Sequence, residues 1–382
     1  MLKLPLKPNI NGLLDFDLTK FPGIVYLAIF FFVSRIPFID LGYSTFSNPK
    51  TDLDSLAIVN SAYLLRYAHV YVASRFPGSP LYEIINSFLI GGGWLATNTA
   101  TMIISFLAAI IFGKILNILH IQNKAVIILT FAFMPVIWIN STITMDYMWA
   151  LMFLLLAFYL VLIEKFYYSA FAVSFAIGCR PTSVFMMIPL LYWMFVIKTD
   201  RKMIYTFLFT SFITTIVIFS PVIYKYGFEF LKYYPREILF NEVFYGITTQ
   251  LISSIAVIVV LIGFIFFRKI PEKDSSFNLS LLVIFIYSLL FIYHPSKPAY
   301  LIPIVPWGLI LLSKIFSKKV AILLCFLLII NSIISVEILN DEKPIKFDHG
   351  SVLKNFDERK SSVAQSKEFM ESLHDIIERD RK

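Results

Sequence analysis

Charged residues are scarce in this sequence. They make up 15% of the chain, against 58% for hydrophobic residues. A soluble domain averages about 25% charged and about 45–50% apolar residues. So large an apolar excess cannot be buried inside one globule of 382 residues. The shortage of charge therefore excludes an ordinary soluble protein and predicts an integral membrane protein, with lipid as its solvent.

Cysteine is rarer still. Cys179 and Cys325 both lie in apolar stretches, and their spacing is not that of a metal site. We expect two buried thiols that act as small hydrophobic side chains. The predicted design therefore contains neither disulfides nor a cysteine-ligated metal.

The sequence also lacks an internal repeat, a low-complexity segment and the cleavage site of a secretory signal peptide. Its formal net charge is +8. In a membrane protein an excess of Lys and Arg marks the cytoplasmic loops. We therefore attribute the charge to topology and expect no nucleic-acid partner.

Eleven apolar segments are candidates to cross the bilayer, and two of them, Phe166–Cys179 and Ala299–Leu312, are short for this purpose. A spanning helix needs about 20 apolar residues, so we expect an all-α polytopic membrane protein with about 11 transmembrane helices. The segments are Pro22–Phe38, Asn98–Leu119, Ala125–Ile139, Tyr147–Ile163, Phe166–Cys179, Pro181–Ile197, Met203–Tyr224, Leu251–Phe267, Leu279–Tyr293, Ala299–Leu312 and Val320–Glu337.

Lys and Arg in the short loops favour a cytoplasmic N-terminus in a multi-pass protein of the cell membrane. This orientation predicts a cytoplasmic segment over 1–21, a transmembrane module over 22–338 and a polar C-terminal tail over 339–382. It also predicts that the loops over 40–97 and 227–250 face outward. Apolar residues at helical spacing in the tail, from Ser361 onward, indicate a short amphipathic helix that is docked or interfacial.

The loop over 40–97 is unusual, because connections are commonly about two to six residues long. We expect two helices in it, Ser55–Tyr67 and Leu81–Ile90, along the outer membrane surface. Asp52 and Asp54 precede the first helix, where an Asp can act as its cap. Such a pair of acids could also hold a metal for a nucleotide-sugar transferase. Nucleotide sugars, however, are made in the cytoplasm, on the other side.

Several short motifs share one further pattern. Asp54-Ser55 is followed some twenty residues later by Arg75-Phe76-Pro77-Gly78-Ser79-Pro80-Leu81-Tyr82. The other motifs are Ser34-Arg35, Gly178-Cys179-Arg180-Pro181-Thr182 and His294-Pro295-Ser296-Lys297-Pro298-Ala299-Tyr300-Leu301-Ile302-Pro303. Together with the hydropathy profile from about residue 20 to 338, they resemble the GT-C superfamily of membrane glycosyltransferases. The nearest likeness is to its protein-mannosyltransferase-like branch, which has His-Pro where this chain has Arg75-Phe76, and Arg where it has Ala299.

The resemblance implies a sugar transfer on the extracytoplasmic side. The donor would be a polyprenyl phosphate (dolichol phosphate, for example) linked to a hexose such as mannose, and the acceptor a protein or a glycan. The acceptor hydroxyl needs a base close to the anomeric carbon. Asp54 matches that role and Asp52 is its local competitor. Transfer in one displacement would invert the anomeric centre.

The departing lipid phosphate needs positive charge at the membrane surface. Each cation at a segment end has an alternative role, in which its side chain extends to the interface and binds nothing. We assign no metal ligands, and a divalent cation stays open as a cofactor. The candidates for substrate binding are Arg75, Glu83, Asp146, Arg180, His294, Lys297 and Tyr300.

Two other classes of function fit a multi-pass protein. A transporter or flippase of lipid-linked or polar solutes commonly has paired repeats and ionisable residues near the bilayer midplane. Here no repeat is visible, and the ionisable residues gather on one side. A non-catalytic subunit of a surface-glycan assembly machine would keep the membrane spans but would need no outer acid.

Overall fold

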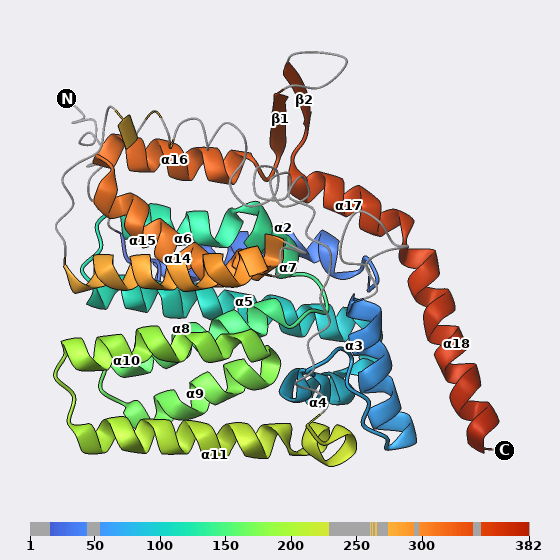
Figure 1. Cartoon of the computed structure of the whole chain (residues 1–382). Helices are drawn as coiled ribbons and strands as arrows, with labels where there is room; N and C mark the ends of the chain where they lie inside the picture. The colour runs from blue at the N-terminus through green and yellow to red at the C-terminus, as the bar shows by residue number, and fades with distance from the viewer. Residues whose placement is uncertain are drawn as a thin grey trace.

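The computed structural model describes residues 16–43, 54–228, 274–293, 298–338 and 345–381, with four further positions between 260 and 265. Nearly all of this is helix, and most helices run side by side in one bundle (Figure 1). A short antiparallel hairpin, β1 (Ile334–Ile338) and β2 (Ile345–His349), projects from one end of it. Apart from this hairpin, the all-α architecture is confirmed.

Three helical stretches in these ranges are long and apolar enough to cross a membrane: Pro80–Ile118, Arg201–Tyr226 and Ser275–Ile292. They correspond to α4 (Pro80–Leu89) with α5 (Gly93–Ile118), to α11 (Arg201–Tyr226) and to α14 (Ser275–Tyr293). The other bundle helices are shorter. They are α2 (Gly23–Ile39), α6 (Lys124–Phe133), α7 (Pro135–Asn140), α8 (Tyr147–Leu162), α9 (Phe166–Cys179), η3 (Pro181–Met186), α10 (Met187–Val196), η6 (Pro298–Ile304), α15 (Val305–Ile315) and α16 (Lys318–Ile330).

The core lies where α5, α8, α9 and α11 pack on one another in turn. Phe158 of α8 is fully buried, and its ring lies 5.5 Å from that of Trp193 and 4.8 Å from that of Trp307. Such aromatic packing joins α8 to α10 on one side and to α15 on the other. These ring contacts therefore hold three helices together inside the core.

Two predicted segments differ in the structure. Ala125–Ile139 is divided into α6 and α7, because Pro135 forces Met134 into an extended conformation with ψ 148°. Val320–Glu337 ends as a helix at Ile330, and its last residues form β1. The segment Leu251–Phe267 and the loop over 227–250 lie almost wholly outside the described residues.

The long loop contains the two expected helices, with shifted bounds. α3 (Asp54–Tyr63) continues into a π-helical turn, Leu64–Ala68, and α4 begins at Pro80. α3 runs across the end of the bundle (Figure 1). The tail holds two helices rather than one, α17 (Ser351–Ser361) and α18 (Val363–Arg381), at the same end as α3.

Candidate functional site

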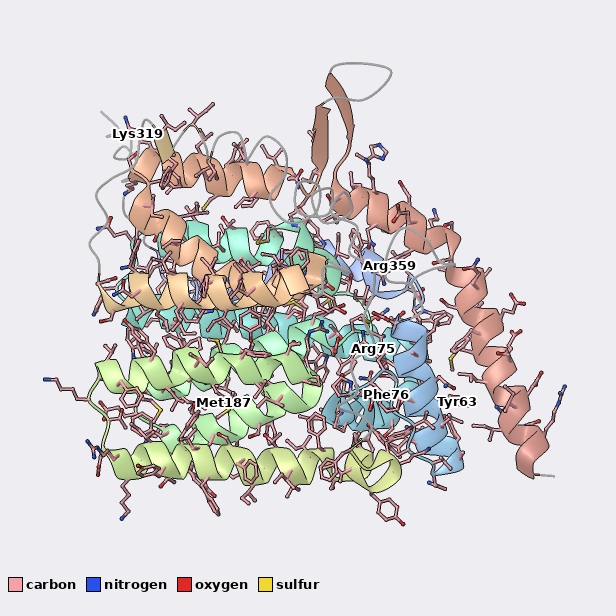
Figure 2. The ribbon with its side chains drawn as sticks, in the orientation of Figure 1. Tyr63, Arg75, Phe76, Met187, Lys319 and Arg359 are labelled. Atoms are coloured by element: carbon pink, nitrogen blue, oxygen red, sulfur yellow. The ribbon has the colours of Figure 1, made fainter. Side chains whose placement is uncertain are left out.

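Two acids and two arginines alternate in a row at this end of the bundle. Arg75 donates from Nη1 to Asp54 Oδ2 at 2.9 Å and from Nη2 to Asp146 Oδ2 at 3.2 Å. Arg180 donates from Nη1 to both carboxylate oxygens of Asp146 at 3.3 Å. Figure 2 labels Arg75 beside α3, where the helix connections meet. The row joins residues separated by 126 positions, from 54 to 180, into one charge-balanced cluster.

Local sequence explains how the row is assembled. Asp54 is the first residue of α3, and Asp146 directly precedes α8. Arg180 ends α9 in an extended conformation (φ −150°, ψ 110°), which the following Pro181 favours. Arg75 lies in the connection before α4. Each charged side chain therefore comes from a junction between helices, where the backbone can direct it across the bundle end.

Asp146 is the hub of the row. It is 1% exposed and accepts hydrogen bonds from both arginines and, at 3.3 Å, from Ser79 Oγ. Burial opposes the charge on Arg75, but the carboxylates of Asp146 and Asp54 raise its pKa well above the usual range. The pKa of Arg180 is raised in the same way, by Asp146 against burial. Both arginines thus stay positively charged.

Two tyrosines fix Arg180 from its sides. The guanidinium carbon lies 4.3 Å from the ring centre of Tyr147 and 4.3 Å from that of Tyr300. Cation–π contacts of this kind are worth up to about 2 kcal/mol when desolvated. Tyr300 belongs to η6, so this contact also ties the last motif of the sequence to the site.

Glu83 supports the site without facing it. Its side chain is fully buried and accepts hydrogen bonds from Tyr71 Oη at 2.5 Å and from Ser74 N and Oγ at 2.8 and 2.5 Å. Both carboxylate oxygens are thereby engaged. α11 braces the same connection, since Tyr226 Oη accepts from Ala73 N at 3.1 Å. Glu83 thus shapes the connection that presents Arg75, and its contact with a substrate stays a prediction.

The predicted residues divide into three groups. The structure brings together Asp54, Arg75, Asp146, Arg180 and Tyr300, and it places Glu83 behind them. Asp52, His294 and Lys297 lie outside the described residues. Sequence reasoning assigned no role to Tyr147 or Ser79, although Tyr147 directly follows Asp146 and Ser79 lies inside the motif that begins at Arg75.

Two further features bear on ligands. Within the described ranges, no group of three or more His, Cys, Asp or Glu side chains could hold a metal ion. Between the two acids of the row lies the guanidinium of Arg75. An apolar cavity of about 290 Å³ lies alongside α15. Its lining residues are Met134, Val260, Phe264, Ile304, Val305, Gly308, Leu309, Leu311, Leu312, Ile315, Phe316, Leu324 and Leu328.

Comparison with protein-family models, with curated proteins and with solved structures finds no match to this chain.

Proposed function

We propose that this protein is a membrane glycosyltransferase that moves a sugar from a polyprenyl-phosphate donor to a protein or glycan acceptor. One observation carries the proposal. A carboxylate that is 22% exposed, Asp54, ends a row that also holds two fixed arginines. An accessible base beside a pair of guanidinium groups is the combination that transfer from a lipid phosphate needs.

The two acids suit different roles. Asp146 is buried and engaged by three donors, so its part is to hold Arg75 and Arg180 in place. Asp54 accepts from Arg75 at 2.9 Å and is 22% exposed, so its carboxylate can be reached from solvent. It is the acid that can take a proton from an acceptor hydroxyl.

The reaction would proceed in one step. The acceptor oxygen bonds to the anomeric carbon as its proton passes to Asp54. The bond from that carbon to the phosphate oxygen breaks, and the electron pair leaves with the lipid phosphate. Arg75 and Arg180 neutralise the charge that grows on the phosphate. Inversion of the anomeric centre is what the resemblance to the GT-C superfamily implies.

The proposal includes a topology of eleven crossings with the site outside. Basic residues crowd the helix ends opposite the site, and Figure 2 labels one of them, Lys319, far from Arg75. By the positive-inside rule such an end is cytoplasmic. The residues concerned are Lys114, Lys124, Lys165, Lys198, Arg201, Lys202, Lys314, Lys318 and Lys319. This supports a lipid-borne donor, since nucleotide sugars are cytoplasmic.

The apolar cavity supports the same donor. Its lining includes Ile304, which lies four residues after Tyr300, the residue whose ring stacks on Arg180. An isoprenoid chain could lie along α15 with its phosphate directed toward the arginines. The cavity wall is apolar along its length, which suits a hydrocarbon chain and not a sugar.

The test is transfer from a radiolabelled polyprenyl-phosphate hexose in membranes that contain the protein. Asp54→Asn is expected to lower the rate by about a hundredfold or more while the protein still accumulates, because the base is lost. Asp375→Asn, the same change at an exposed position of α18, is the matched control. Wild-type rates in the Asp54→Asn membranes would overturn the role of this acid.

A transporter would move the donor with its sugar–phosphate bond intact, so the same assay separates the two functions. Mass spectrometry of surface glycans and glycoproteins after deletion of the gene would then name the sugar and the acceptor. Unchanged glycans together with an intact donor would refute the transferase proposal.

A further inference from the structure

A buried arginine of the C-terminal tail reaches the segment that carries Asp146. Arg359 of α17 is fully buried. It donates from Nη1 to Thr142 Oγ1 at 3.0 Å, and from Nη2 to Thr142 O at 2.9 Å and to Phe38 O at 3.0 Å. These acceptors are neutral, and burial lowers the pKa of Arg359 to about 9. Burying a guanidinium costs free energy, and the three hydrogen bonds of Arg359 offset part of that cost.

Thr142 belongs to the connection of residues 141–146 between α7 and α8. All six residues are buried. Their polar side chains are held by different parts of the chain. Arg35 of α2 donates to Ser141 Oγ at 2.8 Å, and Thr144 Oγ1 donates to Asn98 of α5 at 2.8 Å. The connection is thus clamped along its length, and Arg359 supplies the clamp at Thr142.

The second tail helix reaches the other acid of the row. α18 packs against α3, which begins at Asp54. Leu373 and Ile377 share an apolar cluster with Val59 and Tyr63. Tyr63 Oη lies 3.2 Å from His374 Nδ1. Figure 2 labels Tyr63 on the face of α3 toward α18, and Arg359 where α17 meets the bundle.

We infer that α17 and α18 form part of the functional site, with Arg359 as a positioning residue that fixes Asp146 through the 141–146 connection. α17 holds the segment of the buried acid, and α18 holds the helix of the accessible acid. The tail therefore sets how the two acids face each other across Arg75. This inference rests on the proposed function for its catalytic consequence, but its structural part can be measured separately.

The measurement is hydrogen–deuterium exchange of the purified full-length protein in detergent, read on peptides that cover 141–147. Arg359→Gln is expected to raise exchange there about tenfold, because two donors to Thr142 are lost, while peptides of α11 stay unchanged. Arg379→Gln, at an exposed position of α18, is the control. Thr142→Val removes the side-chain acceptor alone, and about a threefold rise at the same peptides is expected. This second variant serves if Arg359→Gln does not accumulate.

Sugar transfer is measured on the same variants, below the temperature at which they unfold. Positioning predicts a fall in kcat/KM of about tenfold for Arg359→Gln, whereas a purely structural role leaves kcat/KM of the folded protein unchanged. Unchanged exchange over 141–147 in both variants would overturn the inference, whatever the activity. Raised exchange in a protein whose wild type transfers no sugar would refute the proposed function and leave the clamp established.

Discussion

Replacing Asp146 by Asn should destabilise the protein more than any other single change in the row. The substitution keeps the shape of the side chain and removes the charge that Arg75 and Arg180 share. Arg75 still contacts Asp54, and Arg180 still lies between two tyrosine rings. Breaking a buried ion pair costs about 3–5 kcal/mol, and these remaining contacts favour the lower end, about 3 kcal/mol. Asp54→Asn removes a partly exposed pair and should cost about 1 kcal/mol or less.

Both variants would be unfolded by SDS titration in mixed micelles, with tryptophan fluorescence as the signal. Arg180→Gln completes a double-mutant cycle with Asp146→Asn. We expect a coupling free energy on the order of 2 kcal/mol between these two changes. Once Asp146→Asn has removed the ion pair, Arg180→Gln has no further pair to break and should cost correspondingly less. If Asp146→Asn cost no more than Asp54→Asn, or if the cycle showed no coupling, the description of Asp146 as the buried hub would be refuted.

Two other changes test the supports of the fold. Glu83→Gln replaces a carboxylate oxygen by an amide group that donates, facing the donors of Tyr71 and Ser74. It should therefore lower the free energy of unfolding by about 2 kcal/mol and speed hydrogen exchange over 71–79. Near the other end of the bundle, burial tends to raise the pKa of Asp17, but hydrogen bonds from Thr19 and Asn117 lower it overall. A lowered pKa means that the ionised Asp17 carboxylate stabilises the folded protein. This contribution to stability is present above the pKa of Asp17 in the unfolded chain, and it is lost as the pH falls through the pKa of Asp17 in the folded protein. Asp17→Asn should therefore lower the free energy of unfolding by about 1 kcal/mol at neutral pH. The difference between wild type and variant should narrow below about pH 4. A difference that stays constant with pH would contradict this role of Asp17.

Helix positions followed from the sequence because long apolar segments dominate it. The two helices of the loop were predictable for a related reason, since each has an apolar face and a turn separates them. The break before Pro135 was missed because the surrounding residues are uniformly apolar. The end of α16 at Ile330 was missed because Ile333 and Ile334 continue the apolar pattern into β1. Hydropathy measures apolar content, and it does not register where backbone geometry changes.

Part of the site was predictable as well. A common side for Asp54, Arg75, Asp146 and Arg180 was expected from the number of predicted crossings between them. What each carboxylate contacts could not be read in this way, because a contact depends on how the connections fold across the bundle end. Glu83 is an example. Its position in the sequence places it near the site, but only the structure shows that its carboxylate oxygens accept hydrogen bonds from Tyr71 and Ser74.

The tail was the least predictable part of the site. Its amphipathic pattern indicated a helix with an apolar face, and either lipid or protein could cover such a face. The structure covers it with α3. Nothing in the sequence around Arg359 distinguishes it from the other basic residues of the tail, yet it alone among them is fully buried in the described part of the chain.

The position of Arg75 between the two acids gives the proposed reaction a direction. At rest the row holds two acids and two arginines, so its charges cancel. When Asp54 takes the proton of the acceptor, its hold on Arg75 weakens. At the same moment negative charge grows on the leaving phosphate, and Arg75 can then stabilise that charge. Proton transfer and phosphate departure would then reinforce each other through one side chain.

Lysine at the position of Arg75 keeps the positive charge but cannot bridge two oxyanions with a planar fork. Arg75→Lys should therefore retain donor binding while kcat falls about tenfold or more; an unchanged kcat would mean that the bridge has no part in the chemistry.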